Sequence, residues 1–124
     1  MSDFCGKRVL VLEDEPLIAM LLEDILVDLD CVVVGPVLDV GSAEALARDM
    51  TLDAAILDVN IGNRTSHSVA AILRERCVPF VVASGYDDAD LVPGAGGALN
   101  KPYRPENVKA ALARILERSD ALDR

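Results

Sequence analysis

Short, predominantly apolar segments alternate along this chain with longer segments whose apolar residues recur every three or four positions. Segments of the first kind are typical of strands buried on both faces of a sheet. Segments of the second kind are typical of helices with one buried face. The apolar runs are 8–12, 31–35, 54–57, 79–83 and 97–100. This sustained alternation predicts an α/β fold, a doubly wound parallel sheet with helices on both faces.

The segments between the apolar runs predict five helices, which span 16–29, 40–50, 66–76, 86–97 and the residues from 105 onward. The first begins at Pro16, where a first turn tolerates proline, and its predicted buried stripe includes Leu17 and Leu21. Asp39 or Ser42 is the expected cap of the second. The segment 60–65 is expected to be a loop. The pattern is weakest over 86–97, which contains clustered aspartates, a proline and three glycines.

The length of 124 residues predicts one domain, with a core from about 7 to 118 and a short tail over 119–124. The formal net charge of −9 would repel a phosphate backbone, so we expect no nucleic-acid partner. Cys5, Cys31 and Cys77 have no metal-ligand spacing and are expected to be small core residues in a reducing cytosol. No apolar run reaches 18 residues, which predicts a cytoplasmic protein without membrane insertion.

Polar residues follow the predicted strands at the point where each strand ends. In parallel sheets of this class, ligands bind outside the carboxyl ends of the strands. The residues found there are Glu13-Asp14-Glu15, Asp58, Ser84 and Asn100-Lys101. Carboxylates that share one place repel one another unless a cation joins them, and hard oxygen ligands suit Mg²⁺. We therefore expect a divalent cation, Mg²⁺ or a similar ion, at this edge.

Each of these residues, taken alone, also has an ordinary structural explanation. Acids before Pro16 could cap a helix, an aspartate that closes a strand is common in turns, and a Lys-Pro pair is common in surface bends. Their occurrence at four strand ends of one sheet favours a functional site.

These residues occur in motifs that resemble the receiver domain of bacterial two-component response regulators. The motifs are Val-Leu-Val-Leu-Glu-Asp-Glu-Pro (9–16), Ala-Ile-Leu-Asp-Val-Asn (55–60), Val-Ala-Ser-Gly (82–85) and Asn-Lys-Pro (100–102). The resemblance spans residues 7 to about 118. It implies a flavodoxin-like sheet with the strand order 2-1-3-4-5.

The resemblance also implies a role for each site residue. Asp58 is the phosphoacceptor, and Lys101 and Ser84 contact the phosphoryl group. Asp14, Asp58 and the main-chain carbonyl of Asn60 hold Mg²⁺, while Glu13 acts through a bound water. The phosphoryl donor is a histidine kinase, and the phosphorylated form regulates a downstream protein or acts as a phosphate sink. Such a domain is a signalling module that catalyses its own phosphorylation and dephosphorylation, and is not classed as an enzyme.

The chain departs from the usual receiver pattern at Ala98, where the family has an aromatic switch residue three positions before the lysine. The segment from Phe80 to Tyr86 is similar to an atypical, often stand-alone subgroup that is served by histidine kinases of the HWE class. Tyr86 either gates the site or contacts a partner, or it packs on the neighbouring helix. Tyr103 and Arg104 either contribute to a docking surface or pack. Without an aromatic at Ala98, residues 86–97 are the expected carrier of the conformational change.

Two other classes of function stay open on the sequence alone. One is a Mg²⁺-dependent phosphohydrolase with an aspartate nucleophile of the haloacid-dehalogenase type, although those enzymes place the nucleophile after their first strand. The other is a docking module that works without phosphorylation. A nucleotide-binding fold is disfavoured, because the turn after the first strand contains no glycine.

Overall fold

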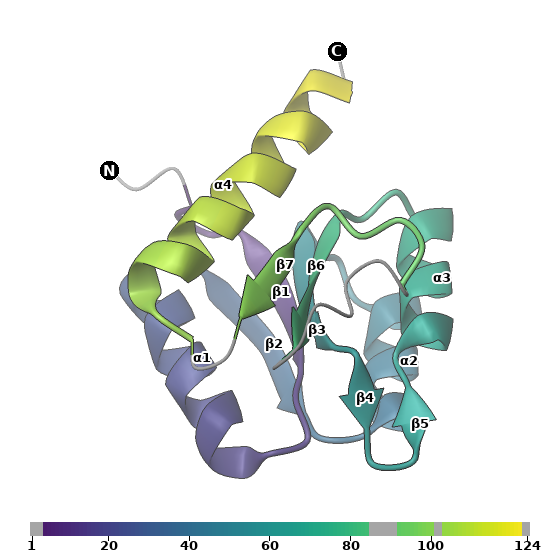
Figure 1. Cartoon of the computed structure of the whole chain (residues 1–124). Helices are drawn as coiled ribbons and strands as arrows, with labels where there is room; N and C mark the ends of the chain where they lie inside the picture. Colours follow the sequence, from purple (N-terminus) through teal and green to yellow (C-terminus); the bar gives the residue numbers. More distant parts are fainter. Residues whose placement is uncertain (1–3, 85–91, 101–102, 123–124) are drawn as a thin grey trace.

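The computed structural model of the chain describes residues 4–84, 92–100 and 103–122, except for the side chains of 84, 100 and 118–122. Its centre is a five-stranded sheet in which all neighbouring strands are parallel (Figure 1). The strands are β1 (Arg8–Leu12), β2 (Val32–Val37), β3 (Ala54–Asp58), β6 (Phe80–Ser84) and β7 (Ala98–Asn100). They lie in the order β2-β1-β3-β6-β7, which confirms the predicted order 2-1-3-4-5.

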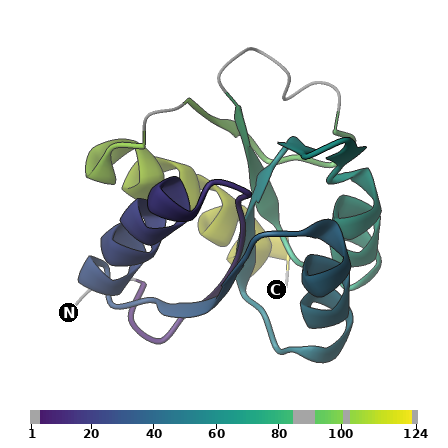
Figure 2. The ribbon, with the colours of Figure 1, turned by 90° about the horizontal axis from the view of Figure 1, so that it is seen from below.

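Helices cover both faces of this sheet. They are α1 (Pro16–Asp28), α2 (Val40–Asp49), α3 (His67–Glu75) and α4 (Pro105–Leu122). Seen from below, α1 and α4 lie on one side of the sheet and α2 and α3 on the other (Figure 2). The helix α4 continues through Leu122, past the point where a tail was predicted. No helix among the described residues is both long enough and apolar enough to cross a membrane.

The two faces of β1 show why the apolar runs become central strands. Successive side chains of a strand point to opposite faces, so a strand that is apolar throughout supplies two cores. Leu10 and Leu12 pack in the cluster beneath α2 and α3, whereas Val9 and Val11 pack in the cluster beneath α1 and α4. All four are at most 1% exposed. The sheet is therefore held from both sides.

The ends of the helices follow local sequence signals. Pro16 is the first residue of α1, where its missing N–H costs no hydrogen bond. Asp39 precedes α2 and caps it, because its carboxylate accepts the Ser42 N–H at 3.3 Å and the Ser42 hydroxyl at 2.7 Å. Of the two predicted caps, Asp39 is confirmed, while Ser42 lies inside the helix and donates to Asp39.

The predicted buried stripe of α1 was partly wrong. Leu17 is 80% exposed and Leu21 is 44% exposed, while the buried positions are Ala19, Leu22, Ile25 and Leu26. The helix is apolar at so many positions that periodicity alone does not select one face, and contact with the sheet decides which side chains are buried. The other side of α1 therefore presents large apolar side chains to solvent.

The segment 60–65 is not the predicted loop but a small hairpin of β4 (Asn60–Ile61) and β5 (Arg64–Thr65). Its two connecting residues are Gly62 and Asn63. Gly62 has φ +61°, a left-handed conformation that glycine adopts without strain. A Gly-Asn pair between two short runs is a known signal for a two-residue hairpin turn.

Two further predictions need correction. Residues 92–97 contain no helix, and the rest of the predicted fourth helix, 85–91, lies outside the described residues. Among the cysteines, Cys31 is buried, but Cys5 and Cys77 are exposed. Cys77 follows α3 with φ +59°, in the turn that leads to β6, and so lies outside the apolar run in the folded chain.

Candidate functional site

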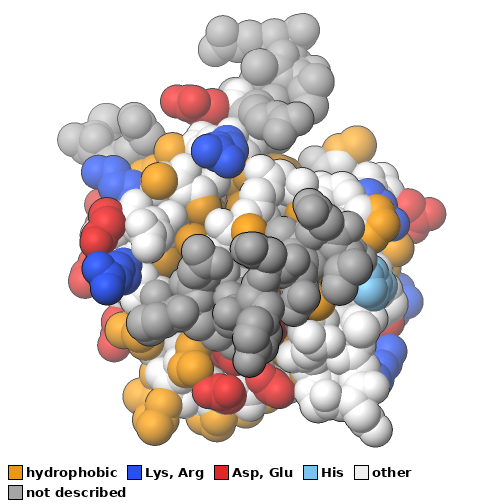
Figure 3. All heavy atoms as spheres, viewed as in Figure 1, with side chains coloured by type: hydrophobic (Ala, Val, Ile, Leu, Met, Phe, Trp, Pro, Cys, Tyr) orange, Lys and Arg blue, Asp and Glu red, His pale blue; other side chains and the backbone are white. Residues whose placement is uncertain are grey.

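Three carboxylates meet at the carboxyl ends of two adjacent strands. Glu13 and Asp14 follow β1 directly, Asp58 is the last residue of β3, and these two strands are paired. One carboxylate oxygen from each residue lies within 4.8 Å of the others. Acidic side chains gather accordingly at the lower edge of the face shown in Figure 3, where β1 passes into α1 in Figure 1. The structure thus brings together three of the site residues that the sequence predicted.

Backbone hydrogen bonds hold the acids in place. The Glu13 N–H donates to the carbonyl oxygen of Val37 at 3.1 Å, which ties the end of β1 to the end of β2. The Glu15 N–H donates to Glu13 Oε1 at 3.2 Å. The Gly62 N–H donates to Asp14 Oδ2 at 3.2 Å, so the β4–β5 hairpin also forms one wall of the site.

Burial makes this cluster electrostatically costly. Glu13 is fully buried, Asp58 is 6% exposed and Asp14 is half-buried. Charges repel more strongly where water is excluded, and neighbouring carboxylates disfavour one another's ionised form. A divalent cation relieves this repulsion, and an all-oxygen donor set suits the hard cation Mg²⁺. The residues present therefore fit a magnesium site.

Tyr103, for which the sequence predicted either a docking surface or packing, is packed in the core and is also a member of the site. It is 4% exposed, and its hydroxyl donates a hydrogen bond to Glu13 Oε2 at 3.2 Å. Burial, followed by the negative charge of Glu13, raises the pKa of the Tyr103 phenol well above its ordinary value. The two residues are 90 positions apart in the chain, so no local pattern could have paired them.

The structure describes the other predicted site residues only in part. Asn60 begins β4, two residues after Asp58, and its side chain is exposed. Ser84 ends β6 and pairs with Asn100, the residue before Lys101, so both chain segments reach the edge that carries Asp58. The Ser84 side chain, Tyr86 and Lys101 lie outside what the structure describes.

Comparison with known proteins gives a family for this chain. Residues 9–113 match the response regulator receiver domain. The chain is 32% identical over 118 residues to the transcriptional regulatory protein PdtaR of Mycobacterium tuberculosis, which covers 90% of this chain and 58% of that protein. The chain spans about half the length of the curated relatives that it matches.

Solved structures with the same fold include the following two. The BeF₃-activated solution structure of SdrG from Pseudomonas melonis Fr1 is 44% identical, with a TM-score of 0.74, and the match covers 90% of this chain and 98% of SdrG. The receiver domain of the sensor histidine kinase PA1611 from Pseudomonas aeruginosa PAO1 is 24% identical, with a TM-score of 0.81, over 91% of this chain and 99% of that domain. That domain has a magnesium ion coordinated in its active-site cleft.

Proposed function

Because the chain belongs to the response regulator receiver domain family, we propose that it accepts a phosphoryl group on Asp58 from a histidine kinase. The observation that carries this proposal is the convergence of Glu13, Asp14 and Asp58 at adjoining strand ends, with oxygens within 4.8 Å of one another. The module would act in a two-component phosphorelay, in which the phosphorylated form regulates a partner protein or drains phosphoryl groups from a shared kinase.

The reaction at Asp58 is a substitution at phosphorus. A carboxylate oxygen of Asp58 forms the new O–P bond while the N–P bond of the donor phosphohistidine breaks, and the electron pair of that bond stays on the imidazole nitrogen. The product is an aspartyl phosphate. Catalysis of such a transfer consists mainly of positioning and charge neutralisation, so the fixed carboxylate at the end of β3 is the part this chain must supply.

The magnesium ligands in this proposal are the carboxylates of Asp14 and Asp58 and the main-chain carbonyl of Asn60, with Glu13 acting through a bound water. The bound cation supplies neutralisation of the negative charge that gathers on the transferred phosphoryl oxygens. The hydrogen bond from the Gly62 N–H supports this assignment, because it fixes Asp14 next to the chain segment that carries Asn60.

Lys101 and Ser84 complete the proposed site. A lysine ammonium pairs with the Asp58 carboxylate and then with a phosphoryl oxygen, while a hydroxyl at Ser84 donates to a second phosphoryl oxygen. The pairing of Ser84 with Asn100 supports these roles, since it brings both chain segments to the same edge. Tyr86, two positions beyond Ser84, is proposed to gate access to the phosphoryl group.

We also propose that the chain is a single receiver domain of the atypical subgroup that is served by HWE-class kinases. The supporting features are Ala98, exposed on the edge strand β7 at the position of the usual aromatic switch, and the Phe80–Tyr86 segment. The match to SdrG, 44% identical over 90% of this chain and 98% of SdrG, supports the assignment of these residues to one domain.

Intact-mass analysis after incubation with acetyl phosphate and Mg²⁺ tests the function directly. We expect one added phosphate on the wild type and none on Asp58→Asn. Asp49→Asn is the matched control, because Asp49 is an exposed aspartate at the end of α2, away from the site. An adduct that persists in Asp58→Asn would reject the assignment. Repeated release of inorganic phosphate without any adduct would indicate a phosphohydrolase.

A further inference from the structure

We propose that Tyr103 is a positioning residue whose hydroxyl holds the Glu13 carboxylate in the orientation that the metal site requires. This inference rests on the proposed function, since it concerns the same acidic cluster. It adds a contact from the chain segment between β7 and α4, which carries Tyr103 two residues before Pro105, the first residue of α4.

The contact is a buried pairing of two polar groups. Glu13 is fully buried and Tyr103 is 4% exposed, so neither can rely on bulk water for hydrogen bonds. The hydroxyl of Tyr103 donates to Oε2 at 3.2 Å, and the Glu15 N–H donates to Oε1 at 3.2 Å. Each carboxylate oxygen thus accepts a donor from a different chain segment, and the plane of the carboxylate is fixed.

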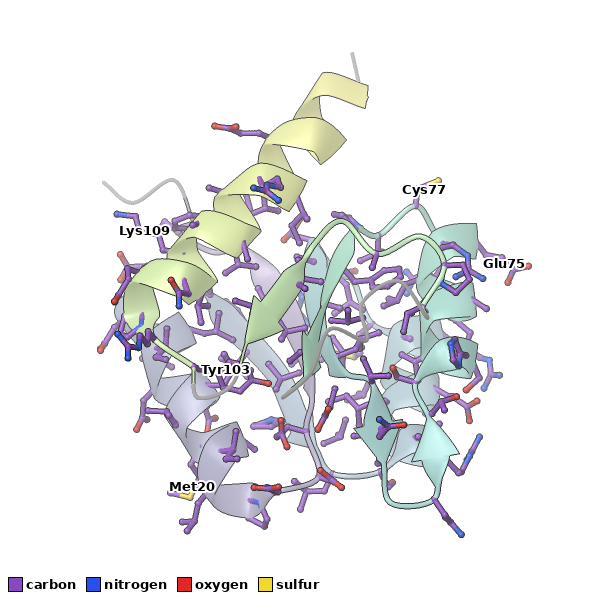
Figure 4. The ribbon with its side chains drawn as sticks, in the orientation of Figure 1. Met20, Glu75, Cys77, Tyr103 and Lys109 are labelled. Atoms are coloured by element: carbon purple, nitrogen blue, oxygen red, sulfur yellow. The ribbon has the colours of Figure 1, made fainter. Side chains whose placement is uncertain are left out.

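The ring of Tyr103 would not need a hydroxyl for packing alone. It lies in the apolar cluster on the α1–α4 side of the sheet, with Val11, Leu112 and Ile115 among the members of that cluster. Figure 4 shows it below the start of α4. Phenylalanine would fill the same space without a buried polar atom that must be satisfied. Within the described part of the chain, the hydroxyl hydrogen bond is made to Glu13, so we infer that its use lies in that contact.

The same hydrogen bond links the acidic cluster to α4. Glu13 shares its cluster with Asp14 and Asp58, and cation binding changes the charge that its carboxylate experiences. Tyr103 lies two residues before Pro105, the first residue of α4, so we expect a shift of the Glu13 carboxylate to move the start of that helix. This path does not involve Ala98, the position where the usual aromatic is missing.

The decisive variant is Tyr103→Phe, which keeps the ring and removes the hydroxyl. Loss of an outer-shell partner, which is the role proposed for Glu13, commonly weakens metal binding 10–100-fold. Tyr103 acts on the metal only through Glu13, so we expect Tyr103→Phe to raise the Mg²⁺ dissociation constant by up to about ten-fold. In a Glu13→Gln background the same change should alter affinity by less than about two-fold, because Tyr103 acts through Glu13. An unchanged or tighter affinity in Tyr103→Phe overturns the proposal, as does an undiminished effect in the Glu13→Gln background.

A spectroscopic readout separates positioning from mere packing. The chain has two tyrosines and no tryptophan, so in Tyr86→Phe the only tyrosine is Tyr103. Mg²⁺ should then perturb the near-ultraviolet tyrosine absorption, and the perturbation should saturate with the same dissociation constant as metal binding measured by calorimetry. A tyrosine spectrum that does not respond to saturating Mg²⁺ contradicts the proposed contact.

Ile115→Val provides the packing control, since Ile115 is a buried member of the same cluster but has no polar atom. It should lower the melting temperature and leave Mg²⁺ affinity at the wild-type value. Equal losses of affinity in Ile115→Val and Tyr103→Phe would reduce Tyr103 to a structural residue and reject the proposal. Failure of the wild type itself to bind Mg²⁺ would instead reject the proposed function.

Discussion

Asp14 adds a third negative charge beside two buried acids, so it opposes folding in the absence of a cation. At 4.8 Å a pair of charges interacts by about 1 kcal/mol even at the dielectric constant of water. We expect Asp14→Asn to stabilise the cation-free protein by about 1 kcal/mol, which corresponds to roughly 4 °C in melting temperature. The asparagine oxygen can still accept the Gly62 N–H, so the local hydrogen bond is kept.

The same variant should lose the response to Mg²⁺. A ligand at 100 times its dissociation constant stabilises the wild type by about 2.7 kcal/mol, whereas Asp14→Asn should gain less than about 0.5 kcal/mol at the same concentration. Thermal denaturation with and without Mg²⁺, with NaCl matched for ionic strength, measures both effects. A full Mg²⁺ response in Asp14→Asn would show that the cluster is not the metal site.

The buried thiol of Cys31 makes the free energy of unfolding depend on pH in the alkaline range. Burial, followed by the negative charge of Asp30, raises the pKa of its thiol from 9.0 to about 11. The neutral thiol is therefore favoured in the folded state. This contribution is complete below pH 9 and is lost as pH rises through 11, because the unfolded chain loses its proton first.

We expect the free energy of unfolding to fall by about 2 kcal/mol more in the wild type than in Cys31→Ala between pH 8 and pH 11. Urea denaturation at the two pH values gives both numbers. Cys77→Ala, which removes an exposed thiol, should behave as the wild type does. Identical pH profiles for the wild type and Cys31→Ala would contradict the assignment.

At the residue scale, the sequence predicted the acids but not the contacts that orient them. Glu13, Asp14 and Asp58 could be found because strand ends of a parallel sheet lie at one edge. Tyr103 could not, because its hydrogen bond to Glu13 depends on how the segment after β7 packs against the end of β1. A contact between segments this far apart produces no repeating pattern in the sequence.

Among the elements, α1 combines a buried face with an unusually apolar outer face next to the acidic cluster. Leu17, Met20 and Leu21 are exposed, and Met20 and Leu21 follow Leu17 by three and four residues, hence they lie on its side of the helix. Figure 3 shows apolar side chains over the lower part of α1, beside the acidic edge, and Met20 lies on this outer side in Figure 4. Exposed apolar patches of this kind often mark protein contacts.

We expect this face of α1 to be used by the kinase and not by small phosphodonors. Burial of a leucine contributes about 1.5–3 kcal/mol, so Leu17→Gln should slow phosphotransfer from the kinase at least about ten-fold. The rate with acetyl phosphate should stay at the wild-type value. Stopped-flow phosphotransfer and acetyl phosphate kinetics give the two rates.

Val27→Gln is the matched control for Leu17→Gln. Val27 is also exposed on α1, but ten residues further along, which is about 15 Å away from the site end of the helix. It should leave both rates unchanged. Equal slowing by Val27→Gln would show a general effect on α1, and equal slowing of the acetyl phosphate reaction by Leu17→Gln would show damage to the site itself.

At the element scale, the limits of sequence-based prediction have physical causes. Most ends of the strands and of the four described helices could be predicted within about two residues. A helix buried on one face and a strand buried on two each leave a characteristic repeat of apolar residues in the sequence. The β4–β5 hairpin was missed because two-residue strands carry no period. The buried face of α1 was misjudged because apolar residues occupy both of its sides.

For the whole molecule, the dominant electrostatic feature is the formal net charge of −9. Repulsion among exposed acids is screened by salt, since the Debye length falls from roughly 30 Å at 0.01 M to 10 Å at 0.1 M. We therefore expect the melting temperature of the cation-free protein to rise by about 3–5 °C between these NaCl concentrations. A fall with added salt would mean that attractive ion pairs outweigh repulsion.

Two substitutions that each remove one negative charge test where that repulsion acts. Asp28 is exposed at the last turn of α1, four residues after the exposed Asp24, where both the neighbouring acid and the helix end disfavour negative charge. Glu44 Oε2 instead lies 3.8 Å from Arg64 Nη2, so removal of the Glu44 charge also removes an attraction. At low salt, Asp28→Asn should raise the melting temperature by about 2–3 °C, and Glu44→Gln by less than half of that. Equal shifts would mean that only the total charge matters, whereas a larger shift for Asp28→Asn that vanishes in high salt places the repulsion at the end of α1.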